Sequence, residues 1–118
     1  MGKHNFKKLK IWQSGMELCQ IVFKITSQFP KEEIYSLTSQ INRSVVSVPS
    51  NIAEGSSRAS NKDFKRFLEI TLGSLFELQT QIVLSSYKDY ITKEELKDLE
   101  DKIEELQKMI SGFKNSLD

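Results

Sequence analysis

Polar side chains at helical spacing in the middle of the chain are the first candidates for chemistry. Steps of three and four residues place them along one edge of a helix: Gln40, Arg43, Ser47, Asn51, Glu54 and Arg58. Glu54 could act as a general base with Arg58 as an anchoring cation. The same two charges, in this order and four residues apart, are also typical of a helix-stabilising ion pair. We therefore favour a structural or interface role for this polar edge.

A basic cluster follows where the sequence predicts a turn between two helices. The residues that we predict to contact nucleic acid are Arg43, Arg58, Lys62, Lys65 and Arg66. Lysine and arginine neutralise backbone phosphates, which favours RNA or DNA as the partner. A second basic patch near the N-terminus consists of Phe6 with Lys3, Lys7, Lys8 and Lys10. The alternatives are that the lysines only solubilise the surface, and that Arg43 and Arg58 join subunits through the polar edge.

Motifs of known catalytic or metal centres are missing from the sequence. It contains no Gly-rich phosphate loop, no paired cysteines or histidines at zinc spacing and no HExxH motif. The single histidine, His4, falls in a segment, residues 1–8, that we expect to be loose. We therefore expect no enzymatic activity, no cofactor and no metal.

Length and composition predict one domain covering residues 1–118. The formal net charge of +1 conceals an uneven distribution. Residues 1–66 carry eleven basic and five acidic side chains, whereas residues 67–118 carry six and eleven. This asymmetry is compatible with nucleic-acid contact on one side, and equally with head-to-tail pairing of subunits.

Cysteine content and hydropathy indicate the compartment. Cys19 is the one cysteine, so an internal disulfide is impossible and a reducing environment is expected. The basic N-terminus has no apolar stretch behind it, and no run approaches the ~20 apolar residues that cross a bilayer. We expect a cytoplasmic protein without membrane contact.

Apolar periodicity and helix-ending signals predict the elements that position these side chains. The expected helices cover residues 9–28, 30–56, 60–87 and 92 to near the end. Short connections make consecutive helices antiparallel, so we predict an all-α, up-down four-helix bundle. Pro49 lies inside the second helix and should bend it, with Ser44, Ser47 and Ser50 available to satisfy freed backbone groups.

Local signals mark the helix starts. Pro30 is expected in the first turn of the second helix, with Glu32 and Glu33 favouring its positive end. Ser60 and Thr92 resemble N-caps of the third and fourth helices. The fourth helix has an unbroken apolar seam, typical of bundle packing: Leu96, Leu99, Ile103, Leu106, Ile110, Phe113 and Leu117.

The first and third helices have apolar faces wider than a surface helix needs. Exposed to water, they would leave an apolar patch that monomers usually avoid, which favours self-association. The expected oligomer interface comprises Trp12, Met16, Phe23, Leu72 and Phe76. The alternative is that two inner helices of one bundle simply require wide faces.

The run SQINRSVVSVPSNIAEGSSR, together with GSLFELQ at residues 73–79, resembles the bacterial 23S rRNA intervening-sequence proteins. Ser44 and Gln79 depart from the family pattern, which usually has alanine and an acidic residue there. The resemblance implies a four-helix bundle that forms ring-shaped oligomers, commonly pentamers. The family name describes where the genes lie and does not establish an activity.

These observations leave three hypotheses. The first is a non-catalytic, oligomeric bundle that binds RNA or other nucleic acid through basic patches, with a possible link to rRNA. The second is a protein-interaction scaffold, since the sequence also resembles, more distantly, the accessory bundle subunits of diversity-generating retroelements, which engage a reverse transcriptase. The third is an enzyme that uses Asn51 and Glu54.

Overall fold

Four long helices make up most of the computed structural model, which describes residues 5–118. They are α1 (Lys10–Thr26), α2 (Leu37–Ser56), α3 (Asn61–Tyr87) and α4 (Lys93–Ser116). Two short 3-10 helices precede α1 and α2, namely η1 (Phe6–Lys8) and η2 (Lys31–Glu33). No strand occurs in this part of the chain, so the all-α four-helix bundle predicted from the sequence is confirmed.

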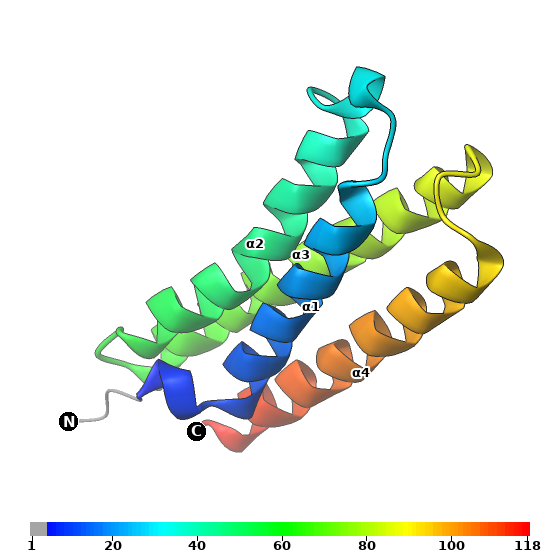
Figure 1. Cartoon of the computed structure of the whole chain (residues 1–118). Helices are drawn as coiled ribbons and strands as arrows, with labels where there is room; N and C mark the ends of the chain where they lie inside the picture. Colours follow the sequence, from blue (N-terminus) through cyan, green and yellow to red (C-terminus); the bar gives the residue numbers. More distant parts are fainter. Residues whose placement is uncertain (1–4) are drawn as a thin grey trace.

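The helices form a four-sided bundle in which consecutive helices run in opposite directions (Figure 1). α2 lies against α1 and α3, while α4 lies against α3 and α1. Because α1 and α3 do not contact each other, they occupy opposite corners of the bundle. The side formed by α1 and α2 is therefore opposite the side formed by α3 and α4.

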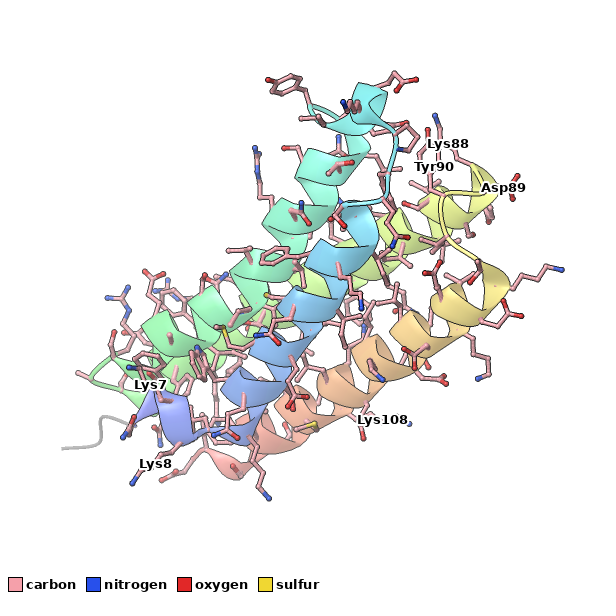
Figure 2. The ribbon with its side chains drawn as sticks, in the orientation of Figure 1. Lys7, Lys8, Lys88, Asp89, Tyr90 and Lys108 are labelled. Atoms are coloured by element: carbon pink, nitrogen blue, oxygen red, sulfur yellow. The ribbon has the colours of Figure 1, made fainter. Side chains whose placement is uncertain are left out.

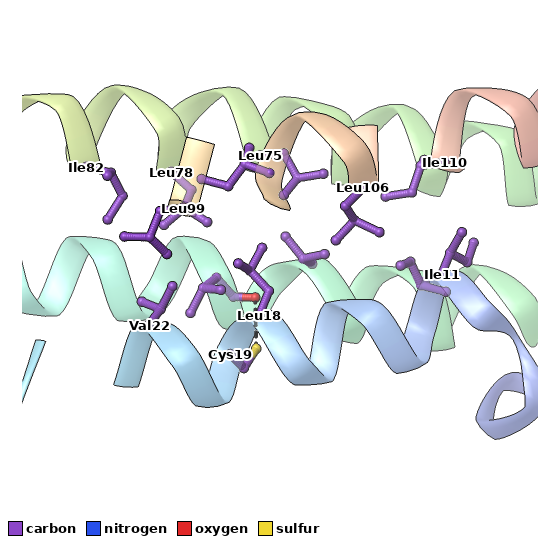
Figure 3. Close-up of a cluster of buried hydrophobic side chains, with 14 of the residues drawn as sticks. Ile11, Leu18, Cys19, Val22, Leu75, Leu78, Ile82, Leu99, Leu106 and Ile110 are labelled. Carbon is purple, nitrogen blue, oxygen red and sulfur yellow. Dashed lines mark hydrogen bonds between the residues drawn. The ribbon is translucent and has the colours of Figure 1, made fainter. Parts of the chain in front are cut away.

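Apolar side chains from all four helices fill the centre (Figure 3). The predicted seam of α4 is confirmed, since Leu99, Ile103, Leu106 and Ile110 are almost completely buried. Leu96 and Phe113 pack against this core from its edge. No helix among residues 5–118 is long and apolar enough to span a membrane.

The start of the second helix differs from the sequence prediction. Pro30 precedes η2 instead of opening α2, and the chain turns through residues 34–36 before α2 begins at Leu37. Glu33 explains the break, because one carboxylate oxygen accepts hydrogen bonds from the Ser36 hydroxyl and the Leu37 amide. Glu33 thus stabilises the start of α2 from outside the helix.

The predicted caps of the third and fourth helices are present. The Ser60 hydroxyl accepts a hydrogen bond from the backbone N–H of Asp63 at 3.1 Å. Thr92 and Glu95 form a complete capping box, with hydrogen bonds of 3.0 and 2.8 Å. Both helices therefore begin where the sequence places their caps.

Residues 5–8, which belong to the segment expected to be loose, pack against the bundle. η1 packs against α1 and α2, and the ring of Phe6 meets that of Trp12 edge to face at 5.3 Å. The side chain of Gln13 also donates a hydrogen bond to the Lys7 carbonyl. Lys3 and His4 lie outside the described residues.

Candidate nucleic-acid and assembly surfaces

Hydrogen bonds within α2 engage much of the polar edge. The Ser47 hydroxyl donates to the Ser44 carbonyl at 2.7 Å, and the Asn51 amide donates to the Ser47 carbonyl at 2.8 Å. Glu54 and Arg58 form an ion pair at 3.0 Å. The ion pair expected from the spacing of Glu54 and Arg58 is present, and the structural or interface role of the polar edge stays a prediction. Gln40 is exposed at the start of the edge.

Pro49 lies inside α2, which continues past it to Ser56. Proline has no N–H for the carbonyl four residues earlier, that of Val45. The thiol of Cys19 on α1 donates to this carbonyl at 3.3 Å (Figure 3). Two of the three serines expected in this role bond elsewhere, since Ser47 donates to the Ser44 carbonyl and Ser44 to Gln81. Burial also raises the pKa of the Cys19 thiol to about 11. The bend itself stays a prediction.

The basic cluster surrounds an aromatic ring at the turn between α2 and α3. Arg58 lies over the ring of Phe67 at 4.8 Å, and Arg66 is 5.9 Å from the same ring. Arg66 also pairs with Asp63 at 3.7 Å. Lys62 and Lys65 form no ion pair with any residue of 5–118. The two lysines are therefore available to an external anion.

The second basic patch reaches the same end of the bundle. η1 lies beside α2 at this end; Lys7 is near the turn between α2 and α3, whereas Lys8 points away from that turn (Figure 2). Neither lysine has an acidic partner among the described residues. We define the basic end of the bundle by these side chains: Lys7, Lys8, Arg58, Lys62, Lys65 and Arg66.

Arg43 does not belong to the basic end. It precedes Ser56, the last residue of α2, by 13 positions, a rise of about 20 Å, and Arg58 lies beyond that end of the helix. The continuous basic track predicted from Arg43 to Arg66 is therefore interrupted. Arg43 is exposed and has no ion-pair partner in the described part of the chain.

Four of the five predicted interface residues lie on two separate surfaces. The first is an apolar groove of about 340 Å³ between α1 and α2, which we call the α1–α2 groove. Its lining consists of Trp12, Met16, Cys19, Phe23, Val46, Pro49, Ser50 and Ala53. Met16, Phe23 and Val46 expose 40–44% of their surface there. Three of the five predicted residues, Trp12, Met16 and Phe23, thus line one groove.

The second surface is on the outer face of α3. We call it the α3 strip, and it consists of Ile70, Phe76, Leu84 and Tyr87, each 46–76% exposed. Leu72, predicted with Phe76, instead packs against the core of the monomer. The sequence analysis missed Ile70, Leu84 and Tyr87. The spacings of 14 residues from Ile70 to Leu84 and of 11 residues from Phe76 to Tyr87 place each pair within about 40° around the helix, which is a usable signal.

A polar cluster joins the two connections at the opposite end of the bundle. Glu33 accepts hydrogen bonds from the Tyr90 hydroxyl at 2.7 Å and from the Lys88 ammonium at 3.3 Å. Its pKa is lowered to about 2 by the hydrogen bond from Ser36, then by that from Tyr90, with Lys88 contributing. The bond to Glu33 raises the pKa of Lys88 and of Tyr90. These partners give the cluster a structural role.

Metal ligation has no candidate in the described residues. No group of three or more histidine, cysteine, aspartate or glutamate side chains within 5–118 is arranged to hold an ion.

Comparisons with known proteins support one family. No curated protein matches the chain. A crystal structure of a protein of unknown function from the S23 ribosomal protein family of Bacteroides thetaiotaomicron superposes with a TM-score of 0.83. The two chains are 21% identical, and the match covers 90% of this chain and 99% of the other, which shows a shared fold. The profile of the 23S rRNA-intervening sequence protein family matches residues 7–112, and the chain therefore belongs to that family.

Proposed function

We propose that this protein is a non-catalytic, oligomeric four-helix bundle that binds RNA or other nucleic acid through its basic end. The observation that carries the proposal is the gathering of unpaired cations from two distant segments. Lys7 and Lys8 come from η1, whereas Lys62 and Lys65 come from the first turns of α3. None of the four is neutralised by an acidic side chain of residues 5–118.

The chemistry of the basic end suits phosphate contact without base-specific recognition. Lysine side chains on a surface bind phosphate as flexible point charges. Arg58 and Arg66 are partly neutralised by Glu54 and Asp63, so we expect them to contribute less to phosphate binding than the lysines do. Both guanidinium groups also contact the ring of Phe67. A few contacts per chain give weak binding, and repetition of the basic end in an oligomer raises the avidity. An RNA ligand is consistent with the rRNA connection in the family name, which itself describes where the genes lie.

The proposed assembly is a homo-oligomer, with a pentamer favoured by the resemblance to ring-forming family members. The exposed α1–α2 groove and α3 strip support association, since monomers usually avoid apolar surfaces of this kind. We place the protein in the cytoplasm, because its one cysteine is reduced and buried.

Binding of a labelled 23S rRNA fragment, followed by fluorescence anisotropy over a range of salt concentrations, tests the proposal. The variant Lys62→Glu/Lys65→Glu/Arg66→Glu reverses three of the six positive charges of the basic end. A matched control, Lys24→Glu/Lys93→Glu/Lys108→Glu, changes net charge equally at exposed positions elsewhere. The first variant should lose at least tenfold in affinity, and its salt slope should fall by about one per lost phosphate contact. Equal affinity of the two variants would overturn the proposal.

A protein-interaction scaffold is the second candidate. The apolar lining of the α1–α2 groove supports it, because such a surface can accept a helix from another protein. A stable complex with a protein partner, combined with unmeasurable RNA affinity at low salt, would favour the scaffold over the nucleic-acid binder.

A further inference from the structure

We infer that the α3 strip of one copy docks into the α1–α2 groove of the next copy, in a head-to-tail contact that repeats around a ring. The inference rests on the self-association included in the proposed function. It adds the two surfaces, their pairing and the residues that fix the register.

A two-fold dimer cannot cover both the α1–α2 groove and the α3 strip, because the two surfaces lie on different sides of the bundle. The groove lies between α1 and α2, whereas the strip is on α3, at the corner opposite α1. A two-fold contact pairs a patch with its own copy, so it would cover one surface and leave the other exposed to water. Joining strip to groove covers both with a single kind of contact. An open chain of copies then has one free groove at one end and one free strip at the other until the ring closes.

The two surfaces have matching heights along the bundle. The Ser44 hydroxyl donates to the Gln81 side chain at 2.9 Å, which aligns the middle of α2 with the middle of α3. Because α2 and α3 run in opposite directions, the groove residues Val46 to Ala53 lie about 3–14 Å from this level toward the α2–α3 turn, and Phe76 and Ile70 of the strip lie about 8 and 17 Å toward the same turn. The groove and this half of the strip therefore overlap in height. Neighbouring copies can therefore lie side by side with their bundle axes parallel.

Charges at the rims of the two surfaces are opposite. Arg43 is three residues before Val46, so it borders the groove on the same side of α2. Glu77 is seven residues from both Ile70 and Leu84, so it lies within the strip. Neither Arg43 nor Glu77 has an ion-pair partner in residues 5–118. An ion pair between Arg43 of one copy and Glu77 of the next would satisfy both charges and set the register.

This arrangement has a consequence for nucleic-acid binding. Copies related by rotation about the ring axis all point the same way, so every basic end lies on one face of the ring. A single RNA strand or helix could then contact several basic ends at once.

Complementation between two variants tests the inference by sedimentation velocity. Val46→Glu damages the groove alone, and Phe76→Glu damages the strip side of α3 alone. Each variant should sediment as a monomer of the 13.6 kDa chain, whereas the unaltered protein forms the larger assembly. A 1:1 mixture should form a dimer with twice the mass of the chain, because one intact groove meets one intact strip. Tyr35→Glu, at a 97% exposed aromatic outside both surfaces, is the matched control and should leave the assembly unchanged.

Charge exchange provides a second measurement that does not depend on apolar packing. Arg43→Glu and Glu77→Arg should each weaken the assembly, and the double variant should restore it. Circular dichroism checks that every variant keeps the helicity of the unaltered protein.

Variants that stay fully assembled, or monomeric variants that do not combine on mixing, would overturn the inference. A monomeric unaltered protein would overturn both the inference and the proposed assembly. Loss of RNA binding with complementation intact would overturn the proposed nucleic-acid function alone.

Discussion

The thiol of Cys19 donates a hydrogen bond to the Val45 carbonyl at 3.3 Å, the acceptor that Pro49 leaves without its helical donor. The contact crosses from α1 to α2 beside the α1–α2 groove. A proline in the middle of a helix is therefore accommodated by a partner from a neighbouring helix, and the positions of α1 and α2 depend on each other there.

Cys19→Val should destabilise the protein, because valine has a similar volume and donates no hydrogen bond to Val45. A weak donor to a buried carbonyl contributes about 0.5–1 kcal/mol to the free energy of unfolding. The cost should shrink in a Pro49→Ala background, where the N–H of Ala replaces the missing donor. Urea unfolding of the four proteins measures this coupling. An equal cost in both backgrounds would show that the thiol does not replace the helical donor.

Glu33→Gln should lower the melting temperature at neutral pH, since the carboxylate accepts hydrogen bonds from Ser36, Tyr90 and Lys88. The pKa of Glu33 is lowered from 4.5 to about 2 in the folded protein. Its stabilising contribution is therefore present above pH 4.5 and is lost as the pH falls through about 2. The melting temperatures of the two proteins should converge over that range in calorimetry. The control Glu32→Gln, at an exposed neighbour, should show little difference at any pH.

Gly55→Ala should be strongly destabilising, because α2 and α3 approach closely there. A methyl group at position 55 would lie 2.7 Å from Cβ of Phe67 and 2.9 Å from Cδ1 of Phe64. Such overpacking costs about 1–3 kcal/mol. Gly112→Ala is the matched control, since nothing lies within 4 Å of the added atom. It should stabilise α4 by up to about 1 kcal/mol through helix propensity. Similar thermal unfolding of both variants would contradict the close approach at Gly55.

Lys7→Glu/Lys8→Glu should weaken RNA binding as part of the same site as the turn between α2 and α3. The physical reason is that η1 packs against α2 and brings its two lysines to the basic end. Anisotropy titrations should show a lower affinity and a smaller salt slope than those of the unaltered protein. An unchanged salt slope would show that Lys7 and Lys8 do not contact the RNA, and the binding site would then consist of the lysines of α3.

The features predicted from the sequence are those with a local cause. The apolar seam of α4 and the caps at Ser60 and Thr92 depend on residues within a few turns, and all are present. The predicted place of Pro30 in the first turn of the second helix is wrong, because the chain forms η2 and a turn before α2 begins at Leu37. Glu33, in η2, is bonded to Lys88 and Tyr90 of the connection between α3 and α4. Sequence periodicity contains no information on contacts between segments so far apart.

The same limit applies to the candidate surfaces. Periodicity identified wide apolar faces on α1 and α3, but it could not show that Leu72 belongs to the core while Phe76 is exposed. The two basic patches were predicted separately, and only the packing of η1 on α2 brings them to one end. The helical face of a residue follows from its spacing, whereas its neighbours on other helices follow from the fold.

The most direct test of the proposed function is the light-scattering mass of the protein at low and moderate salt, with and without a structured rRNA fragment. Our account predicts an assembly of several 13.6 kDa chains at both salt concentrations, which co-elutes with RNA at low salt only. A monomer whose mass is unaffected by RNA at either salt concentration would contradict it.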